Sequence, residues 1–152
     1  AILLINYWLA NNRFIKTIDY KGNKNKYFLF FGIASAVFLG LHSILLGVSF
    51  ENNFYKFFRR FILLGFIIFE IVAQGLLVAI LIKMKSELDL FINKKILILK
   101  TILVSLLAIV ALISIPILNS SEFTYFKHAL EWNYFLGVIS FYLLTYFFWK
   151  KN

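Results

Sequence analysis

Four apolar stretches dominate this chain of 152 residues, and each is about as long as a helix that crosses a lipid bilayer. They cover residues 27–50, 61–83, 95–118 and 132–149. Because they are continuous rather than alternating, they predict helices and argue against a transmembrane β-barrel. With 62% hydrophobic residues, the sequence predicts an all-α, polytopic transmembrane helical bundle forming a single domain. Loops are expected at residues 11–26, 51–60, 84–94 and 119–131.

Residues 1–10 are apolar and then aromatic, and Arg13 and Lys16 follow them. Aromatic and then basic residues are typical of the exit of a membrane helix, whereas a signal peptide carries its basic residues first. We therefore expect residues 1–10 to be the tail of an earlier span, which precedes four complete spans. An interfacial helix that lies on the inner leaflet is the alternative.

The net charge of +9 is distributed unevenly along the chain. Most basic residues lie before the first stretch, between the second and third, and after the fourth, while the opposite side holds only Lys56, Arg59, Arg60 and Lys127. Short basic loops stay in the cytoplasm, so we expect a cytoplasmic C-terminus in an integral protein of a bacterial inner membrane or a eukaryotic endomembrane. Topology and anionic lipid headgroups account for the charge, and no nucleic-acid partner is expected.

Small residues recur at spacings of four and three along the first stretch, at Gly32, Ala36, Gly40, Ser43 and Gly47. Such a stripe lets two helix backbones approach closely. The pattern predicts packing against another helix of the bundle, with a homodimer seam as the alternative.

Glu70 lies inside the second stretch, and Gln74 follows one helical turn later. A carboxylate in hydrocarbon costs several kcal/mol, so it needs a proton, a partner or a wet cavity. At 1.5 Å per residue, Glu70 lies roughly 13 Å and His42 roughly 12 Å below the outer side. This equal depth predicts that His42 and Glu70 face each other across the first two spans.

Other polar residues approach the same outer half of the bundle. The candidate pocket therefore comprises His42, Glu70, Gln74, Ser114 and Tyr134, with His128, Glu131 and Trp132 at its mouth. Two interpretations stay open. The cluster is either a buried polar clasp between helices or an outward-opening pocket for a lipid headgroup, a proton or a small polar ligand.

No catalytic residue can be assigned from the sequence. The chain has no cysteine, and no serine has a partner by spacing. His128 and Glu131 supply two metal ligands at most, and two distant histidines suit haem poorly. We therefore expect neither a metal site nor a cofactor.

Near the end of the chain, Ala129-Leu130-Glu131-Trp132 is followed by Tyr142-Leu143-Leu144-Thr145-Tyr146. These motifs resemble the final helix of the DRAM family, whose six-span members include autophagy modulators and proteins involved in remodelling GPI lipids. The resemblance implies two spans before residue 27 and a structural or lipid-facing role for Glu131 and Trp132. The motifs cover less than a quarter of the chain, and the family does not account for His42, Glu70 or Gln74.

Together these features predict a multi-pass membrane protein that interacts with lipid or regulates a membrane process without catalysis. One alternative is a membrane enzyme or proton-coupled carrier that uses His42 and Glu70. Another is an accessory subunit of a larger membrane complex, and a homo-oligomer is also compatible with the sequence. A sealed polar cluster would favour the accessory subunit, whereas a cluster open to lipid or solvent would favour the other two functions.

The charge distribution generates a test of topology. Single cysteines replacing Gly22 and Asn152 are both expected to escape an impermeant thiol reagent applied to intact cells, because both positions belong to the basic, cytoplasmic side. Labelling of either cysteine from outside would contradict this orientation.

Overall fold

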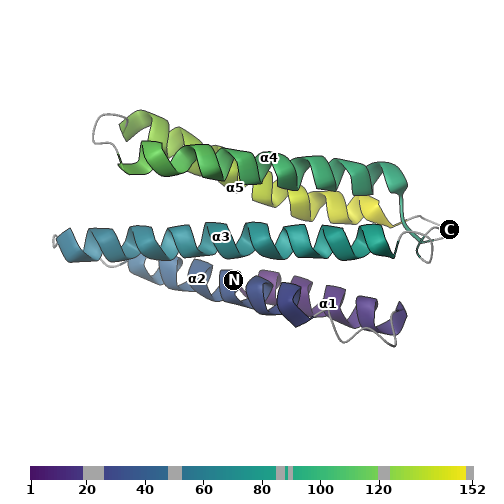
Figure 1. Ribbon diagram of the computed structural model, residues 1–152. Coiled ribbons are helices and arrows are strands. Elements are labelled where there is room, and N and C mark those ends of the chain that lie inside the picture. Colours follow the sequence, from purple (N-terminus) through teal and green to yellow (C-terminus); the bar gives the residue numbers. More distant parts are fainter. Residues whose placement is uncertain (19–25, 48–52, 85–87, 89–90, 120–123, 150–152) are drawn as a thin grey trace. The chain divides into compact units, whose positions relative to one another are not determined.

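The computed structural model describes residues 1–18, 26–47, 53–84, 88, 91–119 and 124–149. These residues form five helices (Figure 1): α1 (Ile2–Ile18), α2 (Lys26–Leu46), α3 (Asn53–Lys83), α4 (Lys94–Asn119) and α5 (Thr124–Phe148). The prediction of an all-α chain is confirmed. The chain divides into two compact units, unit 1 (Ala1–Leu77) and unit 2 (Val78–Asn152), and α3 contributes to both.

Within the described residues, three helical segments are long and apolar enough to cross a membrane. They are Tyr27–Leu46, Phe57–Lys83 and Lys94–Ser114, and they correspond to the first three predicted stretches. Trp132–Phe148 is a shorter apolar segment of α5. These lengths indicate a multi-pass membrane protein, whereas the fourth complete span, the tail of an earlier span and the orientation stay predictions.

Helices occupy parts of three expected loops, so those loop predictions are wrong for residues 11–18, 53–60 and 124–131. In α1, the side chains of Trp8, Asn12 and Ile15 are buried at spacings of four and three, so one packed face continues through the polar segment. At the start of α3, the Tyr55 hydroxyl donates a hydrogen bond to the carbonyl oxygen of Leu45. This bond ties the first turns of α3 to the end of α2.

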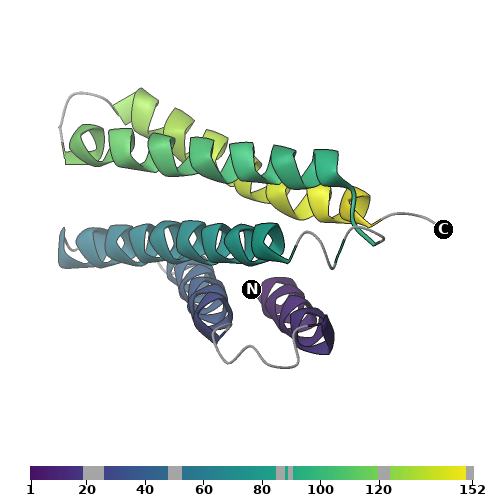
Figure 2. The ribbon, with the colours of Figure 1, turned by 45° about the vertical axis from the view of Figure 1, so that its right-hand side comes forward.

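In unit 1, α1 packs beside α2 (Figure 2), and Trp8 fills the contact between them. The Trp8 side chain is fully buried, and its ring centroid lies 6.2 Å from that of Phe28. A Cβ atom at Gly32 would lie 2.3 Å from Trp8 Cδ2, so only glycine leaves room for the indole. This contact agrees with the close packing predicted for the small-residue stripe, of which Gly32 is the first member.

In unit 2, α4 and α5 lie side by side (Figure 1). The side chain of Leu107 packs on Gly137, where an added Cβ would lie 2.5 Å from Leu107 Cδ2. At the end of α5, the backbone N–H of Asn93 donates to the carbonyl oxygen of Phe148 over 2.8 Å. The last turn of α5 is therefore fixed to the start of α4.

The contact between Gly32 and Trp8 generates a stability prediction. Gly32→Ala is expected to destabilise the protein by about 1–3 kcal/mol, because the new methyl group collides with the buried indole. Thermal denaturation of the purified chain in detergent measures the change.

Gly40→Ala is the matched control on the same helix. A Cβ at Gly40 would meet Ala1 Cβ at 3.4 Å, which is ordinary contact, and alanine favours a helix over glycine by up to about 1 kcal/mol. Gly40→Ala should therefore be neutral or stabilising. Equal effects of the two substitutions would contradict the packing described for Trp8.

Candidate functional site

Three polar side chains from α2 and α3 meet inside unit 1. Ser35 Oγ lies 2.6 Å from Glu70 Oε2, and Gln74 Nε2 donates to Glu70 Oε1 over 2.7 Å. Glu70 and Gln74 are one helical turn apart, so α3 presents both to the same neighbour. We call Ser35, Glu70 and Gln74 the polar cluster.

The side chains of the polar cluster are completely buried. Ser35, Glu70 and Gln74 are each 0% exposed. Ser35 Oγ also lies 2.8 Å from the carbonyl oxygen of Gly32, and Gln74 Oε1 has no hydrogen-bond partner among the described residues. Both oxygens of the Glu70 carboxyl group are thus engaged by side chains of unit 1.

The hydroxyl group of Ser35 is shared between two oxygens. A serine hydroxyl carries one proton, yet Ser35 Oγ is within hydrogen-bond distance of both Glu70 Oε2 and the Gly32 carbonyl. Either the serine proton is shared between the two oxygens, or a second proton lies between Ser35 and Glu70. The second arrangement is a chain of hydrogen bonds from a carboxylic acid through the hydroxyl to the backbone carbonyl.

His42 was predicted to face Glu70 from equal depth, on the assumption that the second span begins at residue 61. Because α3 begins at Asn53, Glu70 lies 17 residues along α3, or about 26 Å from its start. His42 lies only about 6 Å, and Ser35 about 17 Å, before the end of α2 at Leu46. Ser35 contacts the Glu70 carboxyl group although these two distances differ by about 9 Å. Distances from the helix ends therefore do not decide the depth match, and the pairing of half-buried His42 with Glu70 stays a prediction.

The other candidate pocket residues lie in unit 2. Ser114 and Tyr134 are buried, and Ser114 Oγ donates to the carbonyl oxygen of Val110 in its own helix over 2.6 Å. Trp132 is 67% exposed on α5, whereas the side chains of His128 and Glu131 lie outside the described residues. Glu70 and Gln74 are thus brought together, while one pocket containing all the candidates stays a prediction.

A second buried polar contact joins α4 to α5. The Lys100 side chain is 1% exposed, and its Nζ donates to Thr145 Oγ1 over 2.6 Å. The same Nζ lies 4.2 Å from the ring centroid of Phe141 and 5.3 Å from that of Phe148. The spacing of Phe141, Thr145 and Phe148 puts them on one face of α5, where two aromatic rings and a hydroxyl surround the amine.

The sequence did not lead us to predict that Ser35 contacts Glu70 or that Lys100 is buried between α4 and α5. Ser35 lies inside the first apolar stretch, but a single serine there is ordinary because its hydroxyl can bond its own helix. Lys100 lies about one turn inside the third predicted stretch, so its position in the sequence does not separate it from the basic residues that precede that stretch. The spacing of Phe141, Thr145 and Phe148 was the available signal for its partner.

Among the described residues, no group of three His, Cys, Asp or Glu side chains is arranged to hold a metal ion. Comparison of the chain with protein-family models, curated proteins and solved structures gives no match.

The contact between Lys100 and Thr145 is testable by a double-mutant cycle. Thr145→Val is expected to cost about 1–3 kcal/mol of unfolding free energy, because it removes the hydroxyl acceptor from a buried amine. Once Lys100→Met has removed the amine, Thr145→Val should cost less, and the coupling energy should lie between about 0.5 and 3 kcal/mol.

Ser140→Ala provides the control on the same helix, since the exposed Ser140 Oγ donates to the Leu136 carbonyl of α5 itself. Its effect should add to that of Lys100→Met. Additive effects for Thr145→Val and Lys100→Met would contradict the contact.

Proposed function

We propose that this chain is a multi-pass integral membrane protein without catalytic activity, and that it serves as a lipid-embedded accessory subunit. In this proposal, the polar cluster is a clasp between α2 and α3 rather than a binding pocket. The observation that carries the proposal is the complete burial of Ser35, Glu70 and Gln74, with both carboxyl oxygens engaged inside the protein. A sealed carboxyl group has no surface on which to receive a substrate.

We further infer that Glu70 carries a proton. A protonated Glu70 donates to Ser35, Ser35 donates to the Gly32 carbonyl, and Gln74 donates to the remaining carboxyl oxygen. Each of these three contacts is then a hydrogen bond, and the three side chains carry no net charge. Neutrality suits hydrocarbon, where an isolated carboxylate costs several kcal/mol.

Lipid is the expected partner of the outer helix faces. Large apolar side chains are exposed along α2 and α4, among them Phe30 (66%), Ile44 (67%), Ile102 (56%) and Leu112 (68%). Contact with lipid tails avoids the free-energy cost of exposing such side chains to water. Membership of the DRAM family, which the last helix resembles, is part of this proposal and is tested by a direct comparison with its members.

A proton-coupled carrier is the second candidate function. His42 lies seven residues from Ser35 on α2, a spacing of about two helical turns that places both residues on similar faces. A carboxylic acid bonded to a hydroxyl, with a histidine further along the same helix, contains groups able to pass protons. If the chain is such a carrier, Ser35, His42 and Glu70 are required for proton flux rather than for folding.

Substitutions at Glu70 separate these functions. Glu70→Gln is expected to change the free energy of unfolding by less than about 1 kcal/mol, because an amide donates to Ser35 and accepts from Gln74 just as the protonated acid does. Glu70→Ala should destabilise by about 2–4 kcal/mol, because it leaves a cavity and an unbonded amide. Thermal denaturation in detergent measures both changes.

Ser35→Ala should also destabilise, by about 1–2 kcal/mol. Ser43→Ala should be nearly neutral, because the exposed Ser43 hydroxyl donates to the Leu39 carbonyl of its own helix. If Glu70→Gln is as harmful as Glu70→Ala, the cluster requires a charged carboxylate and the neutral clasp is refuted. Proton-linked flux in vesicles that disappears in a stable Glu70→Gln variant would instead establish the carrier.

A further inference from the structure

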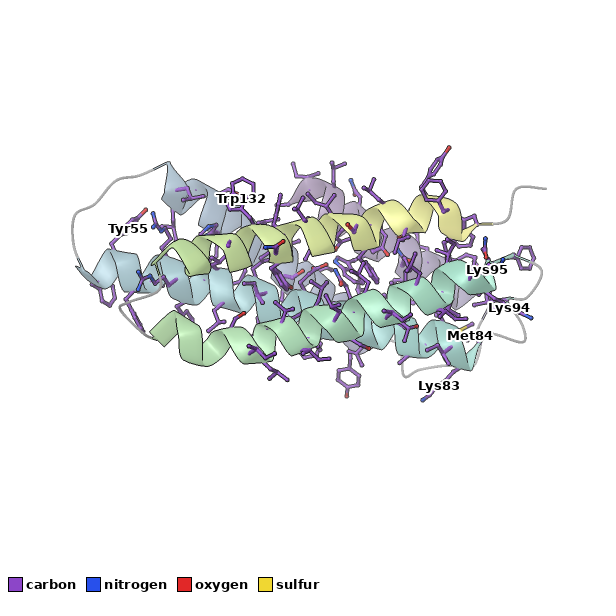
Figure 3. The ribbon with its side chains drawn as sticks, turned by 90° about the horizontal axis from the view of Figure 1, so that it is seen from above. Tyr55, Lys83, Met84, Lys94, Lys95 and Trp132 are labelled. Atoms are coloured by element: carbon purple, nitrogen blue, oxygen red, sulfur yellow. The ribbon has the colours of Figure 1, made fainter. Side chains whose placement is uncertain are left out.

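Exposed lysine side chains gather where α3 ends and α4 begins. Lys83 is the last residue of α3, and Lys94 and Lys95 are the first two residues of α4. All three are exposed, and Figure 3 shows them at the same end of unit 2. We call Lys83, Lys94 and Lys95 the cationic end.

Buried side chains and backbone hydrogen bonds of described residues lie between Lys83 and Lys94. Between α3 and α4, the side chains of Met84, Leu88 and Ile92 are buried at spacings of four. The N–H of Leu88 donates to the Met84 carbonyl over 3.0 Å, and the N–H of Ile92 donates to the Leu88 carbonyl over 3.0 Å. These contacts hold Met84, Leu88 and Ile92 in the core next to the lysines.

Aromatic side chains flank the cationic end. Phe91 is 56% exposed, and Trp149 is 39% exposed next to the α4 start, where it forms an isolated antiparallel bridge with Ile92. Tryptophan and lysine together are typical of the zone between hydrocarbon and water. The membrane-length segment of α4 begins at Lys94 itself, which places the lysines at the edge of that apolar helix.

The charge balance of the surrounding sequence is positive. Residues 83–95 contain four lysines and two acidic residues, Glu87 and Asp89, and Lys150 and Lys151 follow Trp149. Lys85, Glu87, Asp89, Lys150 and Lys151 lie outside the described residues. The acidic residues therefore offset only part of the positive charge.

We propose that the cationic end binds the phosphate groups of anionic phospholipids in the leaflet that it faces. The inference rests on the proposed function, because it requires the helices to be in a membrane. A lysine ammonium is a compact charge that lacks the bidentate geometry of a guanidinium. The surface should therefore select lipids by net charge, so that phosphatidylglycerol and phosphatidylserine bind alike and phosphatidylcholine binds weakly.

Native mass spectrometry of the full chain in detergent micelles, titrated with each lipid, tests the proposal. The wild-type chain should bind phosphatidylglycerol in preference to phosphatidylcholine. Lys94→Gln/Lys95→Gln should lower the affinity for phosphatidylglycerol about 25-fold, or about fivefold for each lysine, without changing that for phosphatidylcholine. Lys94→Arg/Lys95→Arg should keep the preference because the charge is kept.

Arg59→Gln/Arg60→Gln is the matched control, since it removes two charges from the first turns of α3 in unit 1. Equal wild-type affinities for the two lipids, or an equal loss in both double variants, would overturn the inference. Displacement of the lipid by millimolar inorganic phosphate would also overturn it, because the surface would then be a site for soluble anions.

The proposed function is tested separately by alkaline extraction of membranes. Recovery of the chain in the soluble fraction would refute both the membrane protein and the lipid surface. A chain that stays in the membrane pellet but shows no preference for phosphatidylglycerol would refute the lipid surface alone.

Discussion

Hydrocarbon supplies no hydrogen-bond partners, so each polar side chain in an apolar helix must find one within the protein. Isolated hydroxyl groups meet this demand locally. Ser43, Thr101, Ser114 and Ser140 each donate to a backbone carbonyl four residues earlier in the same helix. Glu70, Gln74 and Lys100 have longer and more polar side chains, and their described contacts reach other side chains.

In each unit, one such contact between polar side chains joins two helices. In unit 1, Ser35 of α2 contacts Glu70 of α3, and in unit 2, Lys100 of α4 contacts Thr145 of α5. Both contacts lie in well-packed surroundings. Rings of Phe31 and Phe38 pack on Phe69 in unit 1, at centroid distances of 5.6 and 5.3 Å, and the rings of Phe141 and Phe148 surround the amine in unit 2.

Close packing at glycine complements the polar contacts. Gly32 admits the indole of Trp8 between α1 and α2, and Gly137 admits Leu107 between α4 and α5. Lipid supplies little hydrophobic drive for helix association, so close backbone approach and interhelical hydrogen bonds take on that role. The described contacts thus account for helix pairing within each unit.

The apolar stretches predicted the helices because length and continuous hydrophobicity are properties of the sequence alone. They did not predict the start of α3 at Asn53, since its first turns contain Lys56, Arg59 and Arg60, which resemble a loop. The depth estimate for Glu70 counted from residue 61 and so left these turns out, while the pairing of Glu70 with His42 stays a prediction. Gln74 was identified correctly as a neighbour of Glu70 because a spacing of four needs only helical geometry.

Contacts between helices were harder to predict because they depend on helix rotation and on side-chain reach. Ser35 has a small polar side chain that any helix tolerates, so its sequence context does not distinguish a clasp from a self-bonded serine. The burial of Lys100 was hard to predict for the same reason. Its position in the sequence suggests a basic flank, whereas its burial depends on Phe141 and Phe148 in a helix some 40 residues away.

The contact between α2 and α3 is tested most directly by solid-state NMR on the full chain in lipid bilayers, with ¹³C-labelled serine and glutamate. Oxygen atoms 2.6 Å apart bring Ser35 Cβ and Glu70 Cδ close enough for a strong through-space cross-peak. We expect that peak in the wild-type chain and its loss in Ser35→Ala, which separates it from signals of serines adjacent to glutamates in the sequence. A membrane-inserted wild-type chain that lacks the peak would contradict the clasp.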